Sequence, residues 1–233
     1  MTVKALIFDF DGLLMDTETT LLESWRWEWR RHGLELDPQG FFADHGGDAN
    51  GPRYAALAAA VGPGYERESS HALRMAYRAE LNAALEPAPG IVEWLDRAAE
   101  LGLRLAVASS SPVGHVGTML DRVGLRTRFE VLATGEEVVA HKPDPAVYLV
   151  ALERLGLPEE EAIAFEDTAH GVAAAHAAGL RCVAVPNPYA DRARFTAADL
   201  LLTSAADLTL DAVLAKLTRR AAVSLMHRVT DQG

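Results

Sequence analysis

Short apolar runs alternate along the chain with longer segments of helical periodicity. Five such runs lack the polar alternation of a half-exposed strand; they are residues 3–8, 103–108, 162–165, 182–185 and 200–202. A run of this kind is typical of a strand buried on both faces, and strands separated by helices are typical of a parallel sheet. The pattern therefore predicts an α/β core, a Rossmann-like doubly wound parallel sheet with helices on both faces.

The segment from about residue 17 to residue 86 interrupts this alternation. It has helical periodicity over 22–31 and 70–85, and no part of it has convincing strand character. Asp16 or Thr17 can cap its first helix, and the proline- and glycine-containing residues 86–90 form a stiff return to the core. We expect an all-helical cap over 16–87, inserted into a catalytic core made of residues 1–15 and 88–233.

The charge of the chain limits the partners that it can bind. The formal net charge is −11, and the only lysines are Lys4, Lys142 and Lys216. No basic stripe is available to neutralise a run of phosphates, so we expect no nucleic-acid partner, and the negative field would repel an anionic membrane. An anionic substrate would need a local cation, either a metal ion or a well-placed side chain.

Cysteine content and hydropathy indicate the cellular compartment. Cys182 is the only cysteine, which excludes an internal disulfide, and its apolar surroundings are typical of a buried thiol. The apolar segment before Asp9 is too short for a signal-peptide core, and no apolar run approaches the ~20 residues of a membrane helix. We therefore expect a cytoplasmic protein, while the oligomeric state is not determined by the sequence.

Polar side chains follow the predicted strands at the points where the strands end. In an open parallel sheet, ligands bind beyond the carboxyl ends of the strands, so these residues should converge on one cleft. Lys142, which precedes Pro143 at the expected start of a helix, should join them. The residues that follow the strands are Asp9 and Asp11, Ser109 to Ser111, and Glu166 with Asp167.

This set of side chains suits phosphoryl transfer. Several carboxylates held together repel one another unless a cation joins them, and Mg²⁺ prefers oxygen ligands from carboxylates, water and phosphate. An aspartate beside such a metal stays ionised and can attack phosphorus, and a second aspartate two residues later can protonate the leaving oxygen. The hydroxyl of Ser109 and the ammonium of Lys142 can neutralise the phosphate charge.

The same residues carry a resemblance to a known family. Residues 9–18, DFDGLLMDTE, resemble the signature of haloacid dehalogenase superfamily phosphatases. Residues 108–111 resemble the second motif of that family, 141–143 the third, and 166–168 with the following small-residue helix the fourth. The resemblance extends to about Leu208. Within the family, the chain is similar to sugar-phosphate phosphatases and β-phosphoglucomutases, and this similarity implies a helical cap directly after the first motif.

The resemblance also implies roles for individual residues. Asp9 would be the nucleophile, and Asp11 the general acid and base. Glu166 would bind the metal either directly or through water, and Asp11 would bind it through its backbone. The phosphate group would be bound by Ser109, Ser110 and Lys142. The Mg²⁺ ion would be bound by Asp9, Asp11, Glu166 and Asp167.

Each motif alone has a structural explanation. A cluster of Asp and Gly is often a turn, although a calcium-binding EF-hand is disfavoured because a strand precedes Asp9 and apolar residues follow Gly12. Trp25 and Trp29 share one helix face and should form the core of the cap, whereas Trp27 faces the other way, toward the cleft or a dimer contact. We interpret the histidines at 115, 141, 170 and 176 as surface residues or local hydrogen-bonding groups.

A glycine-rich loop in the cap, residues 45–51, is a candidate for contact with the substrate. The specificity residues that we expect there are His45, Gly46, Gly47, Asp48 and the nearby Arg53.

The family resemblance leaves several activities to compare. A dehalogenase would lack Asp11, and a phosphonatase would need a cap lysine, which this chain lacks. A β-phosphoglucomutase stays an alternative, although Leu21 replaces a histidine of the similar mutases and Pro112 and Val113 replace a Lys-Asn pair. A catalytically silent binding or regulatory protein is a non-enzymatic alternative. The 187–195 segment resembles that of sugar-phosphate phosphatases, so we expect a small phosphorylated metabolite, a sugar or polyol phosphate, as substrate.

Overall fold

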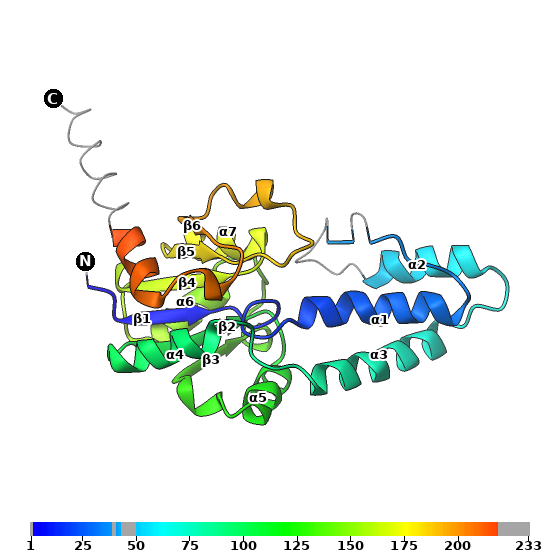
Figure 1. Ribbon diagram of the computed structural model, residues 1–233, viewed down its shortest axis with the longest axis horizontal. Helices are drawn as coiled ribbons and strands as arrows, with labels where there is room; N and C mark the ends of the chain where they lie inside the picture. Colours follow the sequence, from blue (N-terminus) through cyan, green and yellow to red (C-terminus); the bar gives the residue numbers. More distant parts are fainter. Residues whose placement is uncertain (1, 39–40, 43–49, 219–233) are drawn as a thin grey trace.

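The computed structural model describes residues 2–38, 41–42 and 50–218. Its sheet is parallel throughout, with the strand order β3-β2-β1-β4-β5-β6 (Figure 1). This order and the flanking helices confirm the predicted doubly wound α/β core. The strands are β1 (Ala5–Phe8), β2 (Arg104–Ser109), β3 (Val131–Thr134), β4 (Ala162–Glu166), β5 (Arg181–Ala184) and β6 (Leu200–Leu201).

The strand β3 was not predicted from the sequence. It has only four residues and lies at the edge of the sheet beyond β2, with short 3₁₀ turns on both sides of it in the chain. A run this short carries too little periodicity to be distinguished from a loop. Its residues are nevertheless buried, because helices cover the edge of the sheet as well as its centre.

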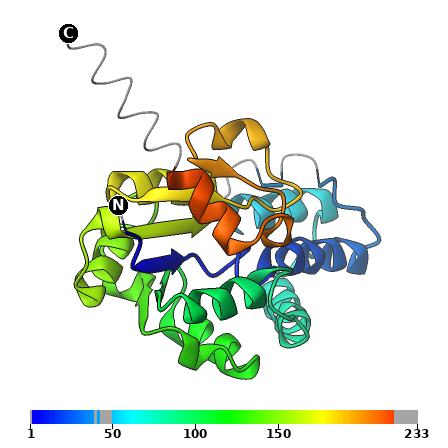
Figure 2. The same ribbon diagram turned by 60° about the vertical axis from the view of Figure 1, so that its left-hand side comes forward.

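The two faces of the sheet have different packing partners. Leu6 and Phe8 of β1 point to one face, where α4 (Ile91–Glu100), α5 (Val113–Arg122) and the final helix over 210–218 cover them (Figure 2). Ala5 and Ile7 point to the opposite face, under α6 (Ala146–Leu155) and α7 (Ala169–Ala177). Alternate residues of a strand face opposite sides, so both faces of β1 are buried and the strand is fixed at the centre of the core.

In the described part of the insert, three helices form a separate layer at the carboxyl ends of the strands (Figure 1). They are α1 (Thr17–Arg31), α2 (Asn50–Val61) and α3 (Arg67–Ala83), and the Asp16 side chain caps α1 by accepting a hydrogen bond from the backbone N–H of Thr19 at 3.0 Å. The helix α2 was not predicted, because its alanine-rich sequence has weak hydrophobic periodicity. Among the described residues of the insert, every regular element is a helix, as expected, and we keep 16–87 as its proposed extent.

The cap has its own small core. Trp25 is fully buried against Tyr54, with ring centroids 4.6 Å apart, and Leu21 and Leu57 complete the cluster. Trp29 packs against the same cluster, as its position on the helix predicts, whereas Trp27 stacks on the Tyr77 ring at 4.6 Å. The tryptophans therefore hold α1 against its neighbours. Among the described residues, none of the helices is long and apolar enough to cross a membrane.

The two faces of α6 provide a matched test of the packing. Leu152 is 6% exposed and packs against the sheet, whereas Leu149 on the same helix is 48% exposed. We expect Leu152→Ala to lower the free energy of unfolding by ~2–5 kcal/mol and Leu149→Ala by less than ~1 kcal/mol, since only the first leaves a cavity. Urea unfolding measures both values, and equal losses would contradict the assignment of the two faces.

Candidate active site

A cleft of about 580 Å³ lies between the carboxyl ends of the strands and the cap helices. Asp9 follows β1, Ser109 ends β2, and Asp167 follows β4, so the parallel sheet delivers all three to one edge. Side chains of the cap helices line the opposite wall of the cleft. The lining residues include Asp9, Asp11, Ser109, Lys142 and Asp167 from the core, and Glu18, Arg53 and Arg78 from the cap.

A buried lysine lies at the base of the cleft. The Nζ of Lys142 donates hydrogen bonds to Asp9 Oδ1 at 2.5 Å, Glu166 Oε1 at 2.6 Å and the Ala108 carbonyl at 2.8 Å. Burial opposes the charge of the ammonium, but the two carboxylates outweigh it and raise the pKa of Lys142. The lysine therefore stays protonated and fixes the orientation of Asp9.

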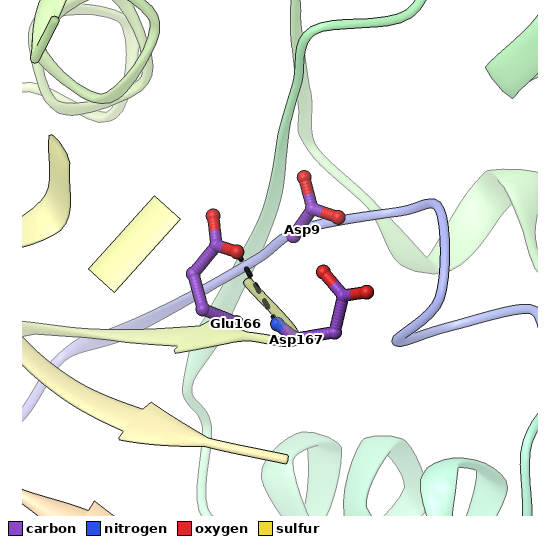
Figure 3. Close-up of side chains that lie close together, drawn as sticks. All are labelled: Asp9, Glu166 and Asp167. Atoms are coloured by element: carbon purple, nitrogen blue, oxygen red, sulfur yellow. Dashed lines mark hydrogen bonds between the residues drawn. The ribbon is translucent and has the colours of Figure 1, made fainter. Parts of the chain in front are cut away.

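Asp9, Glu166 and Asp167 bring three carboxyl groups within 4.8 Å of one another (Figure 3). Burial raises the pKa of Asp9 to about 8, opposed by Lys142 and reinforced by the charge of Glu166. Burial and repulsion by Asp9 and Glu166 raise the pKa of Asp167 well above its ordinary value. When all three groups are ionised, three carboxylates against one ammonium leave an excess of negative charge in a site from which water is largely excluded.

Glu166 and Asp167, two of the three acids in this cluster, differ in their hydrogen bonding. Glu166 Oε1 accepts hydrogen bonds from Lys142 and from the Tyr148 hydroxyl at 2.6 Å, and Oε2 accepts from Asp167 N at 3.2 Å. Both carboxylate oxygens of Asp167 are buried and have no hydrogen-bond partner among the described residues. Buried polar atoms left unpaired are costly, which makes the Asp167 oxygens candidates for binding a cation.

The possible metal ligands in this cluster are the carboxyl oxygens of Asp9, Glu166 and Asp167, and this set fits Mg²⁺, which prefers oxygen ligands. The site also depends on two glycines that let its acids come close to the backbone. A Cβ on Gly12, whose φ is 82°, would lie 2.0 Å from Asp167 Oδ2, and a Cβ on Gly171 would lie 1.9 Å from the Glu166 carboxyl carbon. Any larger residue at these positions would displace the acids, so backbone shape and charge specify the site together.

The side chain of Asp11 is outside this carboxylate cluster. Its Oδ1 accepts hydrogen bonds from Thr17 Oγ1 at 2.8 Å and from His115 Nε2 at 3.0 Å, and its Oδ2 accepts one from Ser111 Oγ at 2.5 Å. Burial raises the pKa of Asp11, but the hydrogen bond and charge of His115, together with both hydroxyls, lower it below its ordinary value. This position of the side chain is consistent with a metal contact through the backbone alone.

The residues expected to bind phosphate are next to Asp9. Ser109 is buried, and its hydroxyl accepts a hydrogen bond from Ser111 N at 3.1 Å, which folds the chain back at the end of β2. Ser110 is exposed and lines the cleft with Ser109. Both serines line the same cleft as Asp9 and Lys142, and Lys142 contacts Asp9 directly.

The expected specificity residues are only partly described. His45, Gly46, Gly47 and Asp48 lie outside the described residues. Arg53 belongs to α2 and lines the cleft, where its Nη2 donates to the Phe41 carbonyl at 2.7 Å and its guanidinium lies 3.9 Å from the centroid of the Phe41 ring.

Comparison with known proteins decides the family. The family model described as "Haloacid dehalogenase-like hydrolase" matches residues 6–185. The chain belongs to this family of hydrolases. YhcW of Bacillus subtilis is 37% identical over 91% of this chain and 96% of its own length. The fructose-1-phosphate phosphatase YqaB of Escherichia coli is 31% identical over 77% of this chain and 95% of its own length.

A solved structure in the haloacid dehalogenase-like family confirms the fold. A mutant of CbbY from Rhodobacter sphaeroides, crystallised with xylulose-(1,5)bisphosphate, is 29% identical and superposes with a TM-score of 0.70. The match covers 89% of this chain and 96% of that chain. The predicted family and fold class are therefore confirmed, including the hydrolase assignment that favours an enzyme over a silent binding protein.

Two residues of this family member line the cleft although they were not predicted there. Arg78 of α3 lines the cleft; its Nη2 donates to the Thr17 carbonyl at 3.3 Å, while its buried Nε has no partner among the described residues. His115, which we expected at the surface or in a local hydrogen bond, contacts Asp11. Neither belongs to a sequence motif, and their approach to the site depends on how α3 and α5 pack, which periodicity alone does not reveal.

The raised pKa of Asp9 predicts how metal binding depends on pH. A metal ligand must lose its proton, so the apparent Mg²⁺ affinity should weaken by at least about tenfold for each pH unit below about 8, because Asp167 also has a raised pKa and must lose its proton too. Without metal, folded Asp9 keeps a proton that the unfolded chain loses near its ordinary pKa, so stability should fall as the pH rises toward about 8. Mg²⁺ should therefore raise the melting temperature more at about pH 8 than at about pH 6.

Thermal unfolding with and without Mg²⁺ measures this effect. Asp167→Asn should abolish most of the increase in melting temperature that Mg²⁺ causes. Asp96→Asn, at an exposed residue paired with Arg128, should keep this increase. A shift that is equal at both pH values would contradict the coupling between Asp9 and the metal.

Proposed function

We propose that this family member is a Mg²⁺-dependent phosphatase that hydrolyses a small phosphorylated metabolite, a sugar or polyol phosphate, through an aspartyl phosphate on Asp9. One observation carries the proposal: Asp9 lies at the base of the cleft, oriented by Lys142 and next to the unpaired oxygens of Asp167. A nucleophilic carboxylate, a fixed cation and free metal ligands are the parts that phosphoryl transfer requires.

In the first step, an oxygen of Asp9 attacks the phosphorus of the substrate. Asp9 Oδ2 accepts no hydrogen bond from the described residues, whereas Oδ1 is held by Lys142. As the new O–P bond forms, the bond from phosphorus to the substrate oxygen breaks, and Asp11 gives its carboxyl proton to that oxygen. Asp11 therefore has to take up a proton when the anionic substrate binds, because His115 and the two hydroxyls favour its carboxylate in the free protein. Lys142, Ser109 and Ser110 hold the oxygens of the transferring group in this arrangement.

In the second step, water hydrolyses the aspartyl phosphate. The Asp11 carboxylate takes a proton from the water, whose oxygen attacks phosphorus, and the bond to Asp9 breaks to release inorganic phosphate. A bound Mg²⁺ supplies charge neutralisation for the phosphate and keeps Asp9 ionised. Asp167 and Asp9 would hold the ion with their side chains and Asp11 with its backbone, while the hydrogen-bonded Glu166 would act through water.

The cap supports a polar, anionic substrate. Burial lowers the pKa of Arg78, and its Nε faces no partner among the described residues, so an acceptor oxygen of the substrate would relieve an unfavourable buried donor. The names of similar proteins point the same way, since YqaB is a fructose-1-phosphate phosphatase and CbbY was crystallised with a sugar bisphosphate.

A β-phosphoglucomutase activity is the second candidate, and Arg78 is the observation that favours it. A mutase must hold a second phosphate, and a cleft-facing guanidinium in the cap provides a cation for one. Leu21 and Pro112 also line the cleft, at positions where the similar mutases carry polar residues. This apolar substitution favours transfer to water over retention of a bisphosphorylated intermediate.

A partition experiment separates the two activities. With Mg²⁺, β-glucose 1-phosphate and a trace of the bisphosphate, we expect phosphate release to exceed formation of glucose 6-phosphate, and a wider panel of sugar and polyol phosphates should identify better substrates. Isomerisation much faster than phosphate release would replace the phosphatase proposal by the mutase. Asp9→Asn, which keeps the size of the side chain but removes the nucleophile, should lose at least ~10³-fold of either activity.

A further inference from the structure

The carboxyl group of Asp11 is held by donors from two parts of the molecule. Thr17, at the start of the cap helix α1, and His115, in the first turn of α5, both donate to Oδ1, and Ser111 donates to Oδ2. Thr17 therefore joins Asp11 to the cap, whereas His115 and Ser111 join it to the core. Each oxygen of the carboxyl group has one donor fixed to the core.

His115 is itself held in a defined place. Its ring meets the fully buried Phe10 ring edge-on, with centroids 5.7 Å apart and an interplanar angle of 90°. The side chain is 31% exposed and lines the cleft, so it is next to the space that the substrate would enter. A ring fixed on one side by an aromatic contact and on the other by a hydrogen bond has little freedom to rotate.

We propose that His115 is a positioning residue for the leaving-group acid: by holding Oδ1, it directs the Asp11 carboxyl group toward the substrate oxygen that departs. This inference rests on the proposed phosphatase chemistry, in which Asp11 protonates that oxygen while the bond from oxygen to phosphorus breaks. A displacement of about 1 Å in a reacting group can cost a factor of ~10² in rate, so the hydrogen bond has a kinetic consequence.

The proposal makes a specific prediction about leaving groups. An alkoxide is a poor leaving group and depends on protonation, whereas a nitrophenolate departs without it. Loss of the His115 contact should therefore slow the hydrolysis of an alkyl phosphate much more than that of p-nitrophenyl phosphate. A residue needed only for folding, or only for binding the phosphate, would affect both substrates by the same factor.

Two substitutions at position 115 separate the donor from the ring. His115→Leu removes the hydrogen bond, and we expect kcat for the alkyl phosphate to fall ~10- to 100-fold while kcat for p-nitrophenyl phosphate changes less than ~3-fold. His115→Gln keeps an N–H donor at similar reach and should recover most of the alkyl phosphate activity. The substrates are glycerol 1-phosphate, or the best alkyl phosphate of the panel, and p-nitrophenyl phosphate, both with Mg²⁺.

A matched control exists elsewhere in the same core. His176 Nε2 lies 3.0 Å from Asp199 Oδ2, the same separation as in the pair of His115 and Asp11, and its side chain is 32% exposed. This pair does not line the cleft. His176→Leu removes a comparable hydrogen bond and should leave the ratio of the two kcat values unchanged.

A double-mutant cycle with Asp11→Asn connects the effect to the acid. If His115 acts through Asp11, adding His115→Leu to Asp11→Asn should lower the alkyl phosphate rate by less than ~3-fold, because the proton donor is already absent. The inference would be wrong if His115→Leu lowered the alkyl phosphate rate of Asp11→Asn by as much as it lowers that of the wild-type protein. It would also be wrong if His115→Leu left the ratio of the two kcat values unchanged. If Asp11→Asn itself fails to discriminate between the substrates, the proposed role of Asp11 is wrong, and the phosphatase mechanism fails before His115 is tested.

Discussion

The buried contact of Lys142 with Asp9 and Glu166 is the constraint on which the site depends. It connects β1, β4 and the loop before α6 through hydrogen bonds of 2.5 and 2.6 Å, at a place with almost no access to water. Removal of the ammonium would leave three buried carboxyl groups without a cation, a situation that is strongly destabilising. With the lysine in place, the negative charge of three ionised carboxyl groups is only partly compensated, and both oxygens of Asp167 have no hydrogen-bond partner among the described residues.

This charge arrangement explains the local backbone. Gly12 and Gly171 bring the chain so close to the Asp167 and Glu166 carboxyl groups that a Cβ would overlap them. The small residues that the sequence places around the acids therefore give the carboxyl groups room to converge.

The cap forms the outer wall of the cleft, where Arg78 and Arg53 line it. Phe42 of the cap also stacks on Tyr189 of the core, with ring centroids 5.5 Å apart. The core therefore contributes the carboxyl groups and the lysine at the base of the cleft, and the cap contributes the two guanidinium groups on its outer wall.

The sequence predicted those parts of the structure that depend on local pattern. Asp9, Ser109 and Asp167 could be assigned to one edge because parallel strands place their carboxyl ends together, and the structure brings them to one cleft. The strand β3 and the helix α2 were missed because one is too short and the other too uniform in composition to give a periodic signal. Arg78 and His115 were missed for another reason, since they reach the cleft only through the packing of α3 and α5, which is a tertiary property.

The central claim is that Asp9, held by Lys142, becomes covalently phosphorylated. The most direct measurement is acid quenching of the protein during turnover of a sugar phosphate with Mg²⁺, followed by peptide mapping with mass spectrometry. The account predicts a phosphate on the peptide that contains Asp9, in the wild-type protein and not in Asp9→Asn. Phosphate on a different residue, or an Asp9→Asn variant that hydrolyses the substrate at the wild-type rate, would contradict it.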